Sequence, residues 1–278
     1  MISEYQHTLK SPISFSGVGL HSGHPTTITL TPAIPYTGIA FVFNDDEQTH
    51  VAANLKNVVS TSYSTSLIKN GCIIQTVEHL LATLYAHHID NCLIYVDENE
   101  IPILDGSAIE FSQAVLSAGY VEQDELVTFF KLPRGRIEVN NSLIITSPND
   151  TEFNVSVDVR FKNISQHKTF RVDSITFHND LAAAPTFVYS DDINKLKQAG
   201  LIKGGSLDNA IVLDSNGDAI NPHKLVFGDD IVRHKILDTI GDFSLCGNRI
   251  LGDIYIFKPG HTVNVQFIKQ LMSTCSPE

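Results

Sequence analysis

The sequence has no excess of basic residues. It contains 19 lysines and arginines against 31 aspartates and glutamates, which gives a formal net charge of −12 at pH 7. General binding of nucleic acid needs a basic surface that neutralises phosphates, so we expect no nucleic-acid partner. A few local lysines or arginines could still hold a small anionic substrate.

The chain also lacks long apolar runs and paired cysteines. No uninterrupted apolar run approaches the roughly 18 residues of a membrane-spanning helix, so we expect no transmembrane segment. The first residues, MISEYQHTLK, lack the apolar core of a signal peptide. The cysteines at positions 72, 92, 246 and 275 lie far apart and form no CxxC pair. They are typical of the reduced thiols of a cytoplasmic protein and argue against a disulfide framework or a cysteine zinc site.

What the sequence does contain is the composition of a folded protein, with 42% hydrophobic and 18% charged residues in a chain of 278. Residues 7–33 form two alternating segments around a Gly-rich turn, and residues 76–89 show the spacing of an amphipathic helix. The pattern restarts near residue 125, again with strands first and helices later. We therefore predict an α+β fold with two related domains, residues 1–125 and 126–278.

The segment DDIVRHKILDTIGDF, which begins at Asp229, predicts a helix with an apolar face and a second, polar stripe. Positions i and i+4 of a helix differ by only about 40° around the axis. His234 and Asp238 can therefore present an imidazole and a carboxylate to one point, although such a pair is more often a surface contact than a metal site. Asp242 follows four residues later, where it could orient another group or fall just past the helix end.

A second predicted helix, in TVEHLLATLYAHHI, contributes Glu78 and His79. By itself this pair would be an ordinary exposed helical turn. Together with His234 and Asp238, however, His79 makes a set of three nitrogen and oxygen ligands, the number that a catalytic zinc has beside its open position. Glu78 is then a candidate base for a water molecule.

Other residues give weaker evidence for a metal or substrate site. His87 and His88 are competing ligands by composition, although His88 lies about 180° around the helix from His79. His261, in FKPGH, follows a predicted strand and a Pro-Gly turn, where a loop histidine is often merely solvated. His21 lies in the Gly-rich turn SGVGLHSG, which suits close ligand approach and a tight hairpin equally. The segment KGGSLDNAIVLD matches neither glycine-rich phosphate-binding pattern, which argues against a nucleotide fold.

Seven motifs occur along the chain: SGVGLHSG, TVEHLLA, IDN, EIPILDGSA, GGSLDNAIV, VRHKILDTIGD and KPGH. Their order and spacing resemble those of the bacterial UDP-3-O-acyl-N-acetylglucosamine deacetylases, which carry out the committed step of lipid A synthesis. The resemblance covers nearly the whole chain. It implies a zinc-dependent hydrolase in the cytoplasm of a Gram-negative-type bacterium, which removes the N-acetyl group of an acylated UDP-sugar as acetate.

The resemblance also implies roles for individual residues. With Zn²⁺ as the metal and Fe²⁺ as an open alternative, the implied metal ligands are His79, His234 and Asp238. The residues implied to act on the amide are Glu78 as general base, His261 as general acid, Asp242 as the support of His261, and Thr186 beside the carbonyl. The implied substrate-binding residues are Phe187, Lys235 and His21. Ser62 and Ser64 stand where relatives carry Met and Cys, which leaves the details of the pocket wall open.

The resemblance further implies that each domain is a helix layer packed on a β-sheet and carries a small inserted element, with the metal site at the junction of the domains. The segment from Phe187 to Asp214 is expected to form the second insert, a βαβ unit that makes a hydrophobic passage for the acyl chain. We expect a monomer. Two alternatives stay open: a zinc hydrolase for a peptide or another N-acyl sugar, and a binding protein that is not catalytic. A base and an acid together favour an enzyme.

Overall fold

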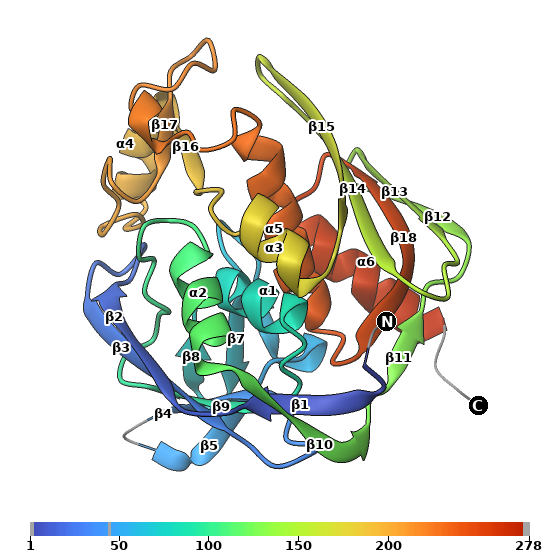
Figure 1. Cartoon of the computed structure of the whole chain (residues 1–278). Coiled ribbons are helices and arrows are strands. Elements are labelled where there is room, and N and C mark those ends of the chain that lie inside the picture. The colour runs from blue at the N-terminus through green and yellow to red at the C-terminus, as the bar shows by residue number, and fades with distance from the viewer. Residues whose placement is uncertain (1–2, 44–45, 275–278) are drawn as a thin grey trace.

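The computed structural model describes residues 3–43 and 46–274. Two larger sheets lie on different sides of a central group of helices, in which α1 and α5 are neighbours (Figure 1). The predicted α+β fold is confirmed. No helix in the described part of the chain is long and apolar enough to cross a membrane.

The first sheet has the order β2 (Ile13–Val18), β3 (Pro25–Pro32), β9 (Cys92–Val96), β4 (Ile39–Phe43) and β5 (Asp46–Ala52). Its central strand β9 runs antiparallel to β3 and parallel to β4. The helices α1 (Glu78–Ala86) and α2 (Ile109–Ala118) share a core with this sheet. The buried side chains of that core include Ile28, Leu30, Phe41, Leu80, Ile94 and Phe111.

The second sheet has the order β12 (Gly135–Val139), β13 (Ser142–Ser147), β18 (Arg249–Phe257), β14 (Phe153–Phe161) and β15 (Ile164–Arg171), with β11 (Phe129–Lys131) also on β18. Its central strand β18 runs antiparallel to β13 and parallel to β14, as β9 does between β3 and β4. Phe153, Val155, Val157 and Val159 alternate along β14 and are buried in one core with side chains of α5 (Asp230–Ser244) and α6 (His261–Thr274). The two sheets therefore repeat one topology.

Both expected inserted elements are present. The first is a small sheet made of β6 (Val58–Ser60), β7 (Ser66–Lys69) and β8 (Cys72–Ile74), which follows the short helix η1 (Leu55–Asn57). The second contains β16 (Phe187–Tyr189), α4 (Ser190–Gln198) and β17 (Ile211–Leu213), with β16 and β17 parallel. This second insert projects from the helices at the upper left of Figure 1. The remaining elements are β1 (Tyr5–Leu9) paired with β10 (Tyr120–Leu126), α3 (Ser174–Asp180) and η2 (Pro222–Lys224).

Helices α1 and α5 approach each other closely at one glycine. A Cβ atom at Gly241 would overlap the backbone carbonyl of Glu78, so a larger residue there would push the two helices apart. This contact brings the N-terminal turn of α1, with Glu78 and His79, against the polar stripe of α5. The site described below depends on it.

The structure decides two helix ends, one of which the sequence had left open. Helix α5 continues to Ser244, so Asp242 lies within the helix and not past its end. Helix α6 begins at His261, whereas the sequence indicated a loop histidine after a Pro-Gly turn. The reason is that the backbone N–H of Asn264 already donates to the carbonyl of Gly260, so helical bonding begins directly after the Pro-Gly pair.

Candidate active site

His79 from α1 and the pair His234 and Asp238 from α5 meet in one buried cluster. Among the described residues, each offers one ligand atom, and these atoms all lie within 4.8 Å of one another. The Nε2 atoms of His79 and His234 lie 3.7 Å and 3.4 Å from Oδ1 of Asp238. Donor atoms this close, in a group of two imidazoles and a carboxylate, can surround a single metal ion.

The remaining contacts of these side chains fit a divalent cation. Oδ1 of Asp238 is buried and accepts no hydrogen bond from the described residues, while Oδ2 accepts one from Nζ of Lys235 at 2.8 Å. Nδ1 of His234 lies 3.1 Å from the carbonyl oxygen of Ala184, a bond that directs its Nε2 lone pair into the cluster. Burial lowers the pKa of His79 to about 3 and also lowers the pKa of His234. Both imidazoles are therefore neutral at pH 7, as metal binding requires.

Glu78 lies beside this cluster with one carboxylate oxygen held and the other directed toward the site. Oε2 accepts the backbone N–H of Thr65 at 3.0 Å, and Oε1 lies 3.8 Å from Nε2 of His261. Burial raises the pKa of Glu78 to about 7, although the nearby His261 opposes the rise. A carboxylate with a pKa near neutrality can accept a proton during a reaction and release it afterwards.

His261, the first residue of α6, is paired with Asp242. Its Nδ1 atom lies 3.0 Å from Oδ2 of Asp242, and its Nε2 atom lies 3.9 Å from Oδ2 of Asp238. Burial alone would lower the pKa of His261, but Asp242, Asp238 and Glu78 outweigh it and raise the pKa to about 9. The imidazole is therefore protonated at neutral pH and can donate from Nε2.

Two residues of this network were not identified from the sequence. Thr65 donates its hydroxyl to Oδ1 of Asp242 at 2.6 Å, and Asn264 donates its amide to Oδ2 of the same carboxylate at 2.9 Å. Asn264 lies one helical turn after His261, so a helix predicted to begin at His261 would have placed both on one face. Nothing in the segment YSTS around Thr65 indicates its role.

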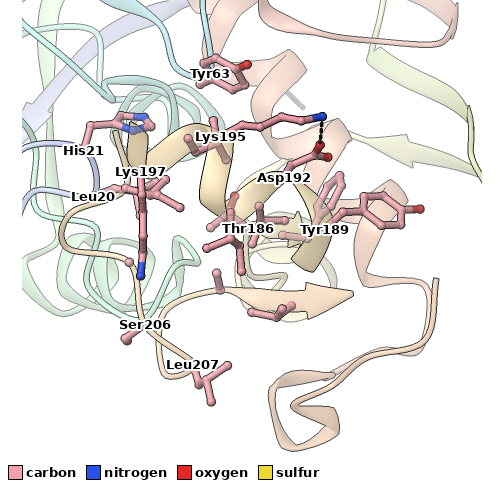
Figure 2. Close-up of a pocket in the computed structure, with 18 residues that line it drawn as sticks. Leu20, His21, Tyr63, Thr186, Tyr189, Asp192, Lys195, Lys197, Ser206 and Leu207 are labelled. Carbon is pink, nitrogen blue, oxygen red and sulfur yellow. Dashed lines mark ion pairs between the residues drawn. The ribbon is translucent and has the colours of Figure 1, made fainter. Parts of the chain in front are cut away.

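A pocket of about 560 Å³ extends from this region into the second insert. Its apolar lining includes Leu20, Val188, Ile193, Leu196, Ile202 and Val212. His21, Thr186 and Phe187, three of the residues expected to meet the substrate, also line it, and Figure 2 shows His21 and Thr186 around the cavity with Tyr63. The Phe187 ring meets the His234 ring edge-on with centroids 6.1 Å apart, so one wall of the pocket contacts a residue of the metal-ligand cluster.

Two expected substrate residues have distinct surroundings. His21 is buried, and burial lowers its pKa, although Glu100 and the backbone of Tyr63 oppose the shift. Lys235 is not free, because it bonds Asp238 and its Nζ lies 5.3 Å from the centroid of the Phe187 ring. Ser62 and Ser64 do not line the pocket, but Tyr63 between them does.

The alternative ligands His87 and His88 lie outside this site. The ring nitrogens of His87 are 2.6 Å from the Ser174 hydroxyl and 2.8 Å from the Ser112 hydroxyl, so both are already bonded. His88 follows at the end of α1, where it adopts a φ of 57°. Neither belongs to the His79 cluster.

Comparison with known proteins gives one consistent result. The family model described as UDP-3-O-acyl N-acetylglycosamine deacetylase matches residues 6–273. The chain belongs to this family. The resemblance inferred from the seven sequence motifs is thereby confirmed, and every residue of the candidate site lies within the matched range.

Individual relatives in this family are similar along nearly their whole length. A protein of Thermodesulfovibrio yellowstonii is 42% identical over 274 residues, which are 97% of this chain and 92% of that protein. A protein of Syntrophotalea carbinolica is 37% identical, with 97% and 88% covered. A protein of Brucella melitensis biotype 1 is 37% identical, with 98% and 96% covered. All three are named UDP-3-O-acyl-N-acetylglucosamine deacetylase.

Proposed function

We propose that this protein is a zinc-dependent deacetylase that hydrolyses the N-acetyl amide of UDP-3-O-acyl-N-acetylglucosamine and releases acetate, the committed step of lipid A synthesis. The observation that carries the proposal is the buried cluster of His79, His234 and Asp238 with Glu78 and His261 directly beside it. The names of the relatives support the choice of substrate. Fe²⁺ is the alternative metal, because the same nitrogen and oxygen donors suit it.

Each residue of the site has a separate role in amide hydrolysis. Zn²⁺ held by His79, His234 and Asp238 would supply Lewis-acid polarisation of the amide carbonyl and lower the pKa of the attacking water. Glu78 accepts a proton from that water through Oε1, since Thr65 holds Oε2. We assign Thr186, which lines the pocket, to the carbonyl oxygen as negative charge develops on it.

His261 completes the reaction as the general acid. Because its Nδ1 is bonded to Asp242, its Nε2 is the atom that donates a proton to the nitrogen of the breaking C–N bond. Water contributes one oxygen of the released acetate and the amide carbonyl the other, and the sugar keeps a free amine. Proton exchange with solvent then returns Glu78 and His261 to their starting states.

The apolar pocket in the second insert is proposed to hold the 3-O-acyl chain. Its lining leads from the insert to Phe187, which is next to the ligand His234. An acyl chain buried there would hold the sugar so that its amide lies at the metal cluster, and the binding energy of a remote group would then be used to position the reacting one. His21 and Lys235 are the polar residues that we assign to the sugar end of the substrate.

We also propose that the chain is a monomer of two domains, residues 1–125 and 126–278, with the site at their junction. The repeated sheet order and the largely separate cores of the two sheets support this division. A cytoplasmic location is proposed as well. Cys72, Cys92 and Cys246 are free, as is usual for proteins in a reducing compartment.

The test is a mass-spectrometric assay with the purified UDP-sugar, with the metal content measured on the same preparation. We expect loss of one acetyl group from the sugar and equimolar acetate in samples that contain about one zinc per chain. If the metal-loaded protein leaves this substrate unchanged but hydrolyses a peptide or another N-acyl sugar, the substrate assignment is wrong. Binding of the UDP-sugar without any hydrolysis would instead indicate a non-catalytic protein.

A further inference from the structure

Thr65 contacts both of the carboxylates that serve the proposed base and acid. It is fully buried, at the end of the segment that joins β6 to β7. Its backbone N–H donates to Oε2 of Glu78 at 3.0 Å, and its hydroxyl donates to Oδ1 of Asp242 at 2.6 Å. One residue of the first insert thereby bonds to α1 and to α5 at the same time.

Glu78 and Asp242 each bond Thr65 through one carboxylate oxygen and direct the other oxygen toward His261. Glu78 gives Oε2 to Thr65 and turns Oε1 toward Nε2 of His261, 3.8 Å away. Asp242 gives Oδ1 to Thr65 and uses Oδ2 to accept Nδ1 of His261 at 3.0 Å. Thr65 thus holds the far oxygen of each carboxylate, and Asn264 also donates to Oδ2 of Asp242 at 2.9 Å.

Thr65 is itself held on both sides. Its carbonyl accepts the backbone N–H of Val77, the residue before Glu78, at 3.3 Å. At the other end of the same segment, the hydroxyls of Thr61 and Thr262 lie 2.8 Å apart, and Thr262 follows His261 directly. The segment is thus anchored beside both the base and the acid, so Thr65 can act as a fixed point for them.

We propose that Thr65 is a positioning residue that fixes Glu78 and the Asp242–His261 pair relative to each other. The inference rests on the roles proposed above for Glu78 and His261. The physical reason is that a carboxylate rotates about its side-chain torsions unless one oxygen is held. Short hydrogen bonds to charged groups are the stronger kind, and a small misplacement of a catalytic group can slow a reaction greatly.

The substitution Thr65→Val tests the hydroxyl, because it keeps the size of the side chain and the backbone N–H to Glu78. We expect kcat to fall by between about 10-fold and 100-fold, the range that corresponds to loss of a hydrogen bond to a charged group. KM should stay within about twofold and the zinc content should not change, because Thr65 contacts neither the pocket nor a metal ligand. Thr65→Ser, which restores the hydroxyl, should recover kcat to within about threefold of the original value.

A matched control separates positioning from general loss of stability. Thr146 is also buried, and its hydroxyl donates to the carbonyl of Pro133 at 2.6 Å in the second sheet, away from the site. Thr146→Val should lower the melting temperature about as much as Thr65→Val does, but it should leave kcat unchanged. If Thr65→Val does not fold, Thr65→Ala is measured in its place.

A double-mutant cycle shows whether Thr65 acts through Asp242. In an Asp242→Ala background the hydroxyl has lost its acceptor, so Thr65→Val should change kcat by less than about twofold. The proposal is wrong if Thr65→Val keeps kcat within twofold in the otherwise unchanged protein, or if Thr65→Ser is as slow as Thr65→Val. It is also wrong if the losses in kcat caused by Thr65→Val and Asp242→Ala multiply in the double variant. Full activity of Glu78→Gln and His261→Ala would instead overturn the proposed function.

Discussion

Replacing His87 tests whether this histidine is a buried structural residue or a metal ligand. His87 is buried at the end of α1, where it contacts Ser112 of α2 and Ser174 of α3. Burial, with a contribution from His178, lowers its pKa from the ordinary 6.5 to about 4. His87→Gln keeps polar atoms for the serines and removes the titrating group.

The pH dependence follows from the direction of this pKa change. Well above pH 6.5, His87 is neutral in both the folded and the unfolded chain, so its protonation costs no stability. As the pH falls from 6.5 toward 4, the unfolded chain binds a proton there that the folded protein does not, and the free energy of unfolding decreases. At pH 5 this difference corresponds to about 2 kcal/mol.

The assay is urea unfolding of the original protein and His87→Gln at pH 8, 7, 6 and 5. Between pH 8 and pH 5, the original protein should lose about 2 kcal/mol more of its unfolding free energy than His87→Gln does. The pH dependence of metal binding is common to both proteins and cancels in the comparison. His24→Gln is the control for replacing a histidine by glutamine at an exposed position, since the side chain of His24 is 67% exposed. Equal pH slopes for the original protein and His87→Gln, or loss of the metal from His87→Gln, would refute this explanation.

Three further predictions concern the reaction. Strong chelation should abolish hydrolysis and limiting Zn²⁺ should restore it, so full activity in a sample verified to be metal-free would contradict the metal assignment. His234→Ala should lose both metal and activity. By contrast, His261→Ala and Glu78→Gln should keep about one zinc per chain and lose the roughly 10²–10⁴-fold that a general acid or base contributes. A His261→Ala protein without zinc, beside a His234→Ala protein that retains it, would reverse the ligand assignment. Removing the 3-O-acyl chain from the UDP-sugar should lower kcat/KM by at least about 10²-fold, or about 2.7 kcal/mol. Equal turnover of both sugars would indicate another N-acyl sugar hydrolase.

Much of the fold could be predicted from the sequence because its patterns are local. The amphipathic spacing of residues 76–89 predicted helix α1, and the apolar face of the segment that begins at Asp229 predicted α5. Helix α3 was missed although a cue exists, because Asp173 caps it by accepting the N–H groups of Ile175 and Thr176. Such cues identify an element without showing what it packs against.

Within the site, the sequence by itself determined the pairs that neighbours on one helix create. His234 and Asp238 converge because residues four apart share a helix face. The tertiary structure alone decided that His79 joins them, because this requires α1 and α5 to pack closely at Gly241. The tertiary structure also decided the role of Thr65, which bonds the carboxylate of Asp242, 177 positions away. Contacts at such separations depend on how the whole chain packs, and no local periodicity of the sequence records them.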